Sequence, residues 1–222
     1  MTTTPTLPPT VDEPELQAES QPGPVSLSVE AGAILLRLAR AVVSATASRR
    51  LRSLDTPSLL PGDSPAEVRA PAAAFVTLYR NGELRGCMGC LDFDLPVWEA
   101  VTSAAASAAF RDPRFPPVAE HEVPSLSIDV SVLGPPVPLT DPSEFRPGVD
   151  GLIVERGGRR GLLLPEVARE HGWDVGEMLE ETSLKAGLPT DAWRDERTHL
   201  LVFRTARVSE ADADNWAPRS RE

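Results

Sequence analysis

Lysine is almost absent from this chain: 21 of its 22 basic residues are arginine, and Lys185 is the single lysine. Two cysteines and three histidines stand in 222 residues, and aromatic residues make up 5%. Two cysteines exclude a small disulfide-built scaffold. No run approaches the ~20 apolar residues that span a bilayer, and the N-terminus lacks the basic start and apolar run of a secretory signal. These absences predict a cytoplasmic globular protein.

Acidic residues are abundant, with 33 Asp and Glu against 22 Lys and Arg, a net charge of −11 and a pI of about 4.8. Nucleic acids and anionic membranes bind basic surfaces. We therefore expect neither as a partner. The chain is long enough for one large domain or two smaller parts, with a sizeable core.

Proline, threonine and scattered acids fill residues 1–25, a composition that buries too little apolar surface to fold. We expect a disordered tail over 1–25, a domain over 26–212 and a flexible tail over 213–222. Apolar stripes at helical spacing predict helices over 31–51, 94–111, 166–170 and 174–186. Alternating or continuous apolar runs predict strands over 75–79, 84–88, 126–132, 151–155, 161–164 and 200–203. Their irregular order is typical of an α+β fold, a mostly antiparallel sheet flanked by helices.

Asn81-Gly82 is the strongest hairpin signal in the chain. A regular two-residue turn there pairs Val76 with Cys87, so that Arg85 and Cys87 share one face of the sheet. A guanidinium beside a thiol favours the reactive thiolate. The alternative is that Cys87 is a small buried apolar residue.

Gly86 and Gly89 flank Cys87. They leave the backbone bare, which permits close approach of a ligand or of another segment. Cys87 and Cys90 also form a Cys-x-x-Cys pair, which suits redox chemistry or half of a zinc site. The scattered positions of the three histidines argue against metal binding.

Four further residues are open to both a functional and a structural interpretation. Arg114 follows the turn residue Asp112 and suits a substrate carboxylate or phosphate. Asp129 and Ser131 share one strand face, which is the solvent side of the sheet unless it lines a cleft. Lys185 lies in a last helical turn, where arginine would serve nearly as well. Its retention therefore favours a role for a compact or titratable amine.

The segment Leu84–Gly89 (Leu-Arg-Gly-Cys-Met-Gly) resembles the Leu-Arg-Gly-Cys-Ile-Gly hallmark of the AMMECR domain family. Further segments resemble the family at Asp112–Val118, Asp129–Leu133, Asp150–Val154, Gly161–Pro165, Gly172–Asp174 and Lys185–Pro189. These motifs cover nearly all of residues 28–210. The chain is thus identified as a member of this family, whose prokaryotic branch is called AmmeMemoRadiSam system protein A.

The resemblance implies an α+β fold of two unequal lobes with a cleft near the hallmark motif. It implies no reaction, because the family has no established one. It does imply a pathway shared with Memo-type and radical SAM proteins, which become expected partners. Arg85, Gly86, Cys87 and Gly89 carry over as site residues.

Two positions depart from the family pattern. Met88 replaces the usual isoleucine, a tolerated exchange. Ser183 stands where archaeal relatives often carry cysteine, so a mechanism with a second cysteine there is not expected. Cys90 lies outside the hallmark, which weakens the redox interpretation of the cysteine pair.

We therefore expect an enzyme that acts on a small metabolite in the cleft. The expected catalytic residues are Cys87, Arg85 and Lys185. The expected substrate-binding residues are Gly86, Gly89, Arg114, Asp129 and Ser131. We expect neither a metal nor a cofactor. The alternative is a non-catalytic binding or adaptor module whose interaction surface is shaped by the hallmark motif.

Overall fold

The computed structural model describes residues 21–215, so positions 1–20 and 216–222 of the predicted tails lie outside the described residues. Residues 21–25 of the predicted N-terminal tail run extended beside the fold. Pro22 is buried and Val25 packs against the first core. Packing thus begins before the expected domain start at residue 26.

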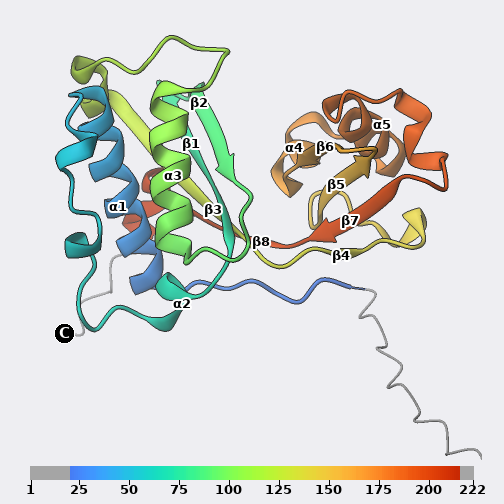
Figure 1. Ribbon diagram of the computed structural model, residues 1–222, viewed down its shortest axis with the longest axis horizontal. Helices are drawn as coiled ribbons and strands as arrows, with labels where there is room; N and C mark the ends of the chain where they lie inside the picture. The colour runs from blue at the N-terminus through green and yellow to red at the C-terminus, as the bar shows by residue number, and fades with distance from the viewer. Residues whose placement is uncertain (1–20, 216–222) are drawn as a thin grey trace, which may run out of the picture.

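The described chain forms two four-stranded antiparallel sheets, each accompanied by helices, which confirms the predicted α+β class. The first sheet has the order β2-β1-β3-β8, with bounds β1 Ala73–Arg80, β2 Glu83–Cys90, β3 Leu126–Leu133 and β8 Thr205–Ser209. Helices α1 (Val29–Ala47) and α3 (Val97–Phe110) lie side by side on one face of this sheet, and the short α2 (Ala66–Arg69) lies below them (Figure 1). The largest apolar core fills the space between these helices and the sheet.

The second sheet has the order β4-β7-β5-β6, with bounds β4 Val137–Pro138, β5 Gly151–Arg156, β6 Arg159–Leu163 and β7 His199–Phe203. Helices α4 (Pro165–His171) and α5 (Val175–Lys185) belong to this part and enclose a second core with it (Figure 1). Short 3₁₀ helices occur at Leu51–Ser53, Pro57–Leu59, Glu120–Ser125, Pro142–Glu144, Thr190–Arg194 and Glu210–Asn215. Strands β4 and β8 were not predicted.

Local signals in the sequence set the helix starts. Ser28 caps α1, and its hydroxyl accepts a hydrogen bond from the Ala31 N–H at 3.2 Å. Asp174 and Glu177 form a reciprocal capping box at the start of α5, with both hydrogen bonds at 2.9 Å. Both caps satisfy N–H groups that have no partner inside the helix.

The β1–β2 hairpin turns at Asn81 and Gly82, whose φ angles of 54° and 82° are those of a type I′ turn. Beyond the turn the pairing slips by one residue, because Leu84 pairs with Tyr79 whereas Gly86 pairs with Leu78. This β-bulge leaves Arg85 without a cross-strand partner. Cys87 consequently pairs with Thr77, and the predicted pairing with Val76 is wrong.

A third apolar cluster joins the two sheets, formed by Ala73, Leu133, Ile153, Leu162 and Phe203. The chain leaves the first sheet after β3 and returns to it at β8. The two connections are held together where the Gly134 N–H donates to the Arg204 carbonyl at 3.0 Å. Over residues 21–215, no helix is long and apolar enough to cross a membrane.

Candidate functional site

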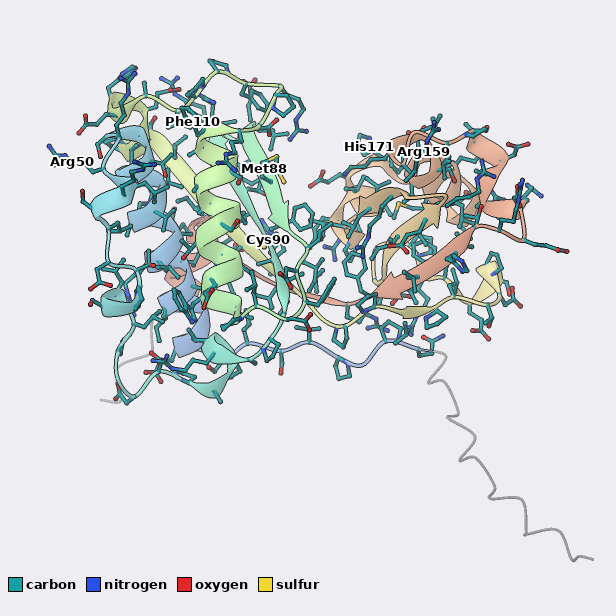
Figure 2. The ribbon with its side chains drawn as sticks, viewed as in Figure 1. Arg50, Met88, Cys90, Phe110, Arg159 and His171 are labelled. Atoms are coloured by element: carbon teal, nitrogen blue, oxygen red, sulfur yellow. The ribbon has the colours of Figure 1, made fainter. Side chains whose placement is uncertain are left out.

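A cavity of about 580 Å³ is lined by residues of both sheets. Its floor is the face of β1, β2, β3 and β8 that is turned away from α1 and α3. Its roof comes from β6, α4 and the end of α5. In Figure 2, the labels Arg159 and His171 locate the roof elements β6 and α4, and the labels Met88 and Cys90 locate strand β2 of the floor. A volume of this size suits a small metabolite. The division into two unequal lobes stays a prediction of the family resemblance.

The strand pairing arranges the side chains of the cavity floor in rows that run across the strands. Cys87 pairs with Thr77, which pairs in turn with Asp129, so these three side chains cross β2, β1 and β3 in one line. The next row holds Gly89, Phe75, Ser131 and Arg207. Paired residues share a face of the sheet. The floor therefore combines a thiol, hydroxyls, a carboxylate and a guanidinium.

Cys87 is half-buried, and the Thr77 hydroxyl donates a hydrogen bond to its Sγ at 3.2 Å. Burial raises the pKa of the Cys87 thiol above its ordinary value, although Thr77, Arg114 and Lys185 act in the opposite direction. The thiol is thus protonated at neutral pH in the protein alone. The predicted thiolate form of Cys87 is therefore wrong for the protein without a ligand.

Asp112 connects Cys87 to Arg114. One carboxylate oxygen of Asp112 accepts the Cys87 backbone N–H at 2.8 Å, and the Arg114 guanidinium binds both oxygens, at 2.9 and 2.7 Å. Mainly because of Arg114, the pKa of the buried Asp112 falls to about 2. Asp112 makes the predicted turn, with its Oδ1 accepting the Arg114 N–H, and also fixes Arg114 at the cavity beside Cys87.

Lys185 ends α5 and lines the cavity from the roof. The residue as a whole is exposed, but protein atoms around its ammonium reduce its hydration and lower the pKa of Lys185. A Cys87 thiolate would oppose that decrease, whereas Arg114 adds to it. The single lysine of the chain thus lies in electrostatic range of Cys87 and Arg114.

Asp129 and Ser131 line the cavity floor with only 3% and 5% of their surfaces exposed. The Asp129 carboxylate accepts hydrogen bonds from the Arg207 guanidinium, one of them at 3.0 Å from Nε. The interpretation of this face as the solvent side of the sheet is wrong, because the roof covers it. Asp129 is held in an ion pair, which limits its use as a base.

Helix α4 supplies carboxylates to the opposite wall. Glu166 and Glu170 lie one helical turn apart, and both line the cavity together with Val167. Tyr79 faces them from the floor. Its pKa is raised, first by burial and then by the charges of Asp129 and Glu170.

Arg85 is absent from the cavity wall. Its guanidinium binds Glu122 through two hydrogen bonds, at 3.1 and 3.0 Å, and donates to the Pro116 carbonyl at 3.0 Å. The bulge at Arg85 redirects its side chain. The predicted placement of Arg85 beside the thiol is therefore wrong, and Arg114 occupies that place.

Comparison with known proteins assigns the chain to a family. The AMMECR1 family model matches residues 36–208. The chain belongs to the AMMECR1 family.

Archaeal relatives support this assignment over most of their length. A protein of Methanothermobacter thermautotrophicus is 45% identical over 185 residues, which are 80% of this chain and 93% of the relative. One of Thermococcus gammatolerans is 44% identical, over 82% of this chain and 91% of the relative. The crystal structure of uncharacterized protein PH0010 from Pyrococcus horikoshii is similar with a TM-score of 0.75 and 40% identity. That similarity covers 83% of this chain and 93% of PH0010.

The two glycines that flank Cys87 serve different contacts. A Cβ on Gly86 would lie 2.5 Å from the Ala108 carbonyl oxygen, so this glycine lets α3 pack against β2. A Cβ on Gly89 would lie 2.5 Å from the Phe75 ring, which lines the cavity. Gly89 therefore shapes the cavity, whereas Gly86 lies outside its wall.

The two cysteines of this AMMECR1 chain face opposite sides of the first sheet. Cys90 pairs with Ala74 and packs against the helical core, whereas Cys87 pairs with Thr77 in the cavity floor. Three residues of extended strand separate their Cα atoms by about 10 Å, beyond the ~7 Å that a disulfide tolerates. The redox-pair interpretation is wrong. Among residues 21–215, no three or more Cys, His, Asp or Glu side chains form a group suited to a metal.

Several residues of the cavity wall were not predicted from the sequence: Thr77, Tyr79, Glu166, Glu170 and Arg207. Thr77 and Tyr79 alternate on β1, so their shared face with Cys87 could have been found from a correct register. Arg207 lies on an unpredicted strand, and α4 carries no local signal that it covers the first sheet.

Proposed function

We propose that this AMMECR1-family protein is an enzyme that acts on a small anionic metabolite, with Cys87 as nucleophile and with Lys185 and Arg114 as the cations that bind the substrate anion beside it. The observation that carries the proposal is the meeting of these three groups in one cavity. Arg114 is held by Asp112 and is 54% exposed, so it is available to a ligand.

Desolvation shifts the pKa values of Cys87 and Lys185 in opposite directions. It raises the pKa of Cys87 and lowers that of Lys185, and the attraction between a Cys87 thiolate and the Lys185 ammonium acts in the opposite direction on both groups. When Cys87 Sγ bonds to an electrophilic carbonyl carbon, the carbonyl π electrons move to its oxygen, that oxygen takes up the thiol proton, and Lys185 remains protonated. An anionic group of the substrate on Arg114 would hold that carbon near the sulfur.

The second candidate is a non-catalytic binding module. The raised pKa of Cys87 favours it, because a protonated thiol is a poor nucleophile. Under this alternative, Cys87 and Thr77 are polar contacts for a ligand that leaves unchanged.

Alkylation kinetics test the role assigned to Cys87. In a Cys90→Ser background Cys87 is the single thiol, and its iodoacetamide rate against pH gives its pKa. We expect an apparent pKa above the ordinary value of 9.0. We expect Lys185→Met and Arg114→Ala each to slow alkylation at pH 8 about threefold, since each removes a positive charge near the thiolate. Arg37→Ala, on the exposed side of α1, is the control. Equal rates in all variants would overturn the assignment.

Metabolite turnover distinguishes the two candidates. Pools of anionic metabolites are screened by thermal shift, and each stabilising compound is then incubated with the wild type and with Cys87→Ala. Consumption by the wild type alone supports the enzyme. Binding without consumption by either protein supports the binding module.

The pathway shared with Memo-type and radical SAM proteins belongs to this proposal as an implication of the family resemblance. Size-exclusion chromatography of this chain mixed with each protein tests direct contact, and separate elution would limit the association to a shared pathway.

A further inference from the structure

Charge is distributed unevenly along the cavity. Arg114 and Lys185 flank Cys87, and the carboxylate at this end is Asp112, which already binds Arg114. This end therefore carries two cations against one anion. A ligand group placed here meets a positive environment beside the thiol.

The other end has the opposite balance. Three carboxylates, Asp129, Glu166 and Glu170, line it together with the Arg207 guanidinium, and a second guanidinium, that of Arg169, lies 3.8 Å from Glu166. Arg207 is already paired with Asp129 across β3 and β8, and the Glu166 and Tyr79 charges also act on it. Three carboxylates thus stand against two guanidiniums, so this end has one carboxylate in excess.

One carboxylate oxygen of Glu166 has no hydrogen-bond donor among the residues that the structure describes. Its Oε2 is buried without a hydrogen-bond donor, and its Oε1 lies 3.8 Å from Arg169, beyond hydrogen-bond length. A buried acceptor without a donor is costly. The Glu166 side chain is 17% exposed and lines the cavity, so a cationic donor bound there would give this carboxylate a short hydrogen bond.

The two ends are separated by the width of the floor. Cys87, Thr77 and Asp129 lie on three adjacent strands, so about 10 Å separates the outer two Cα atoms. Thr77, Tyr79 and Phe75 lie between, a mixture of hydroxyls and aromatic rings. A ligand whose two charged groups are joined by a short aliphatic chain fits this span.

We propose that the ligand of this cavity is a zwitterion, with its anionic group between Arg114 and Lys185 beside Cys87 and its protonated amine against Glu166 and Glu170. The inference rests on the proposed function, because it takes the Cys87 end as the reacting end. It adds the chemical class of the substrate, an amino acid or amino-acid-like metabolite whose two charges are apart.

Protection of Cys87 from iodoacetamide tests this inference in the full chain carrying Cys90→Ser. The probes are 6-aminohexanoate, hexanoate and hexylamine, which share one chain length and differ in charge; 4-aminobutanoate and 8-aminooctanoate vary the length. We expect the best amino acid to protect at about tenfold lower concentration than hexanoate, since it adds one charge-assisted contact. We expect hexylamine to protect least.

Carboxylate variants locate the amine. Glu166→Gln and Glu170→Gln should each reduce the advantage of the amino acid over hexanoate to about threefold or less, with protection by hexanoate unchanged. Glu170 is exposed, so its variant remains informative if Glu166→Gln does not fold. Glu180→Gln, exposed on α5 outside the cavity wall, is the matched control and should change nothing.

The outcomes separate this inference from the proposed function. Equal protection by hexanoate and the amino acids would overturn the zwitterion and leave the anion site in place. An advantage that persists in both carboxylate variants would also overturn it. Failure of every carboxylate probe to protect, or protection by hexylamine alone, would overturn the anion site and the zwitterion together.

Discussion

Arg85 and Glu122 form a two-pronged ion pair outside the cavity, with Nε and one terminal nitrogen of Arg85 on the two carboxylate oxygens. Their side chains are only 12% and 9% exposed. The pair ties the hairpin strand β2 to the segment that precedes β3, and Arg80 adds a second, more exposed contact to the same carboxylate. Arg85 thereby holds two segments of the fold together and takes no part in the cavity wall.

Replacing Arg85 should affect stability and leave the thiol unchanged. We expect Arg85→Ala to lower the free energy of unfolding by about 2 kcal/mol, because Glu122 loses most of its pairing while buried. Urea denaturation measures this loss, with Arg80→Ala as the milder comparison. The iodoacetamide rate of Cys87 should stay within about twofold of the wild type. A large rate change in a stable Arg85→Ala protein would contradict the placement of Arg85 outside the site.

Acid should weaken the fold through the same pair. Arg85, the Ala119 N–H and Arg80 lower the pKa of Glu122 from 4.5 to about 2. Its contribution to stability is therefore complete above pH 4.5 and is lost as the pH falls from 4.5 toward 2. Asp112, lowered from 3.8 to about 2, adds a loss over a narrower range.

Glu122→Gln removes the titrating group and isolates this effect. Between pH 6 and pH 3, the wild type should lose about 2 kcal/mol more of its unfolding free energy than Glu122→Gln does. Urea titrations of both proteins at the two pH values make the comparison. Parallel losses would show that Glu122 does not carry the acid sensitivity.

Gly86 and Gly89 should respond differently to replacement by alanine. Gly86→Ala places a methyl group against the α3 backbone, which cannot yield cheaply, so we expect a loss of about 3 kcal/mol. Gly89→Ala meets the Phe75 ring, which can turn, so we expect a loss of about 1 kcal/mol and an altered cavity. Thermal melts and Cys87 alkylation rates measure the two effects; equal stabilities of the variants would refute the distinction.

Oxidation should not join the two cysteines. Because Cys87 and Cys90 face opposite sides of the first sheet, we expect mild oxidation by diamide to leave no intramolecular disulfide in the folded protein. Intact-mass analysis under native and denaturing conditions checks this, and the unfolded chain serves as the positive control. A disulfide formed in the native protein would contradict the strand register.

Features that depend on neighbours in sequence could be predicted. Ser28, the Asp174 and Glu177 pair, and the Asn81-Gly82 turn each act within a few residues, and each is found in the structure. The bulge at Arg85 has no such signal, because it is decided by packing along the whole of β2. This shift of one residue in the strand register made the predicted position of Arg85 and the predicted partner of Cys87 wrong.

The candidate site itself depends on contacts distant in sequence. Asp129 has the same alternating pattern whether solvent or α4 covers it, so its burial could not be read from β3 alone. Arg207 reaches it from a strand 78 positions later. Lys185 was found through its rarity, a signal that owes nothing to local structure.

The apolar cluster between the sheets contributes to the cavity as well. Leu162 is a member of it, and Phe75, Leu91 and Leu164 pack against it; all four also line the cavity. Folding of the chain therefore gives the binding space its form before any ligand arrives. A small molecule entering it has little of the protein left to order, so affinity can come from a few well-placed polar contacts.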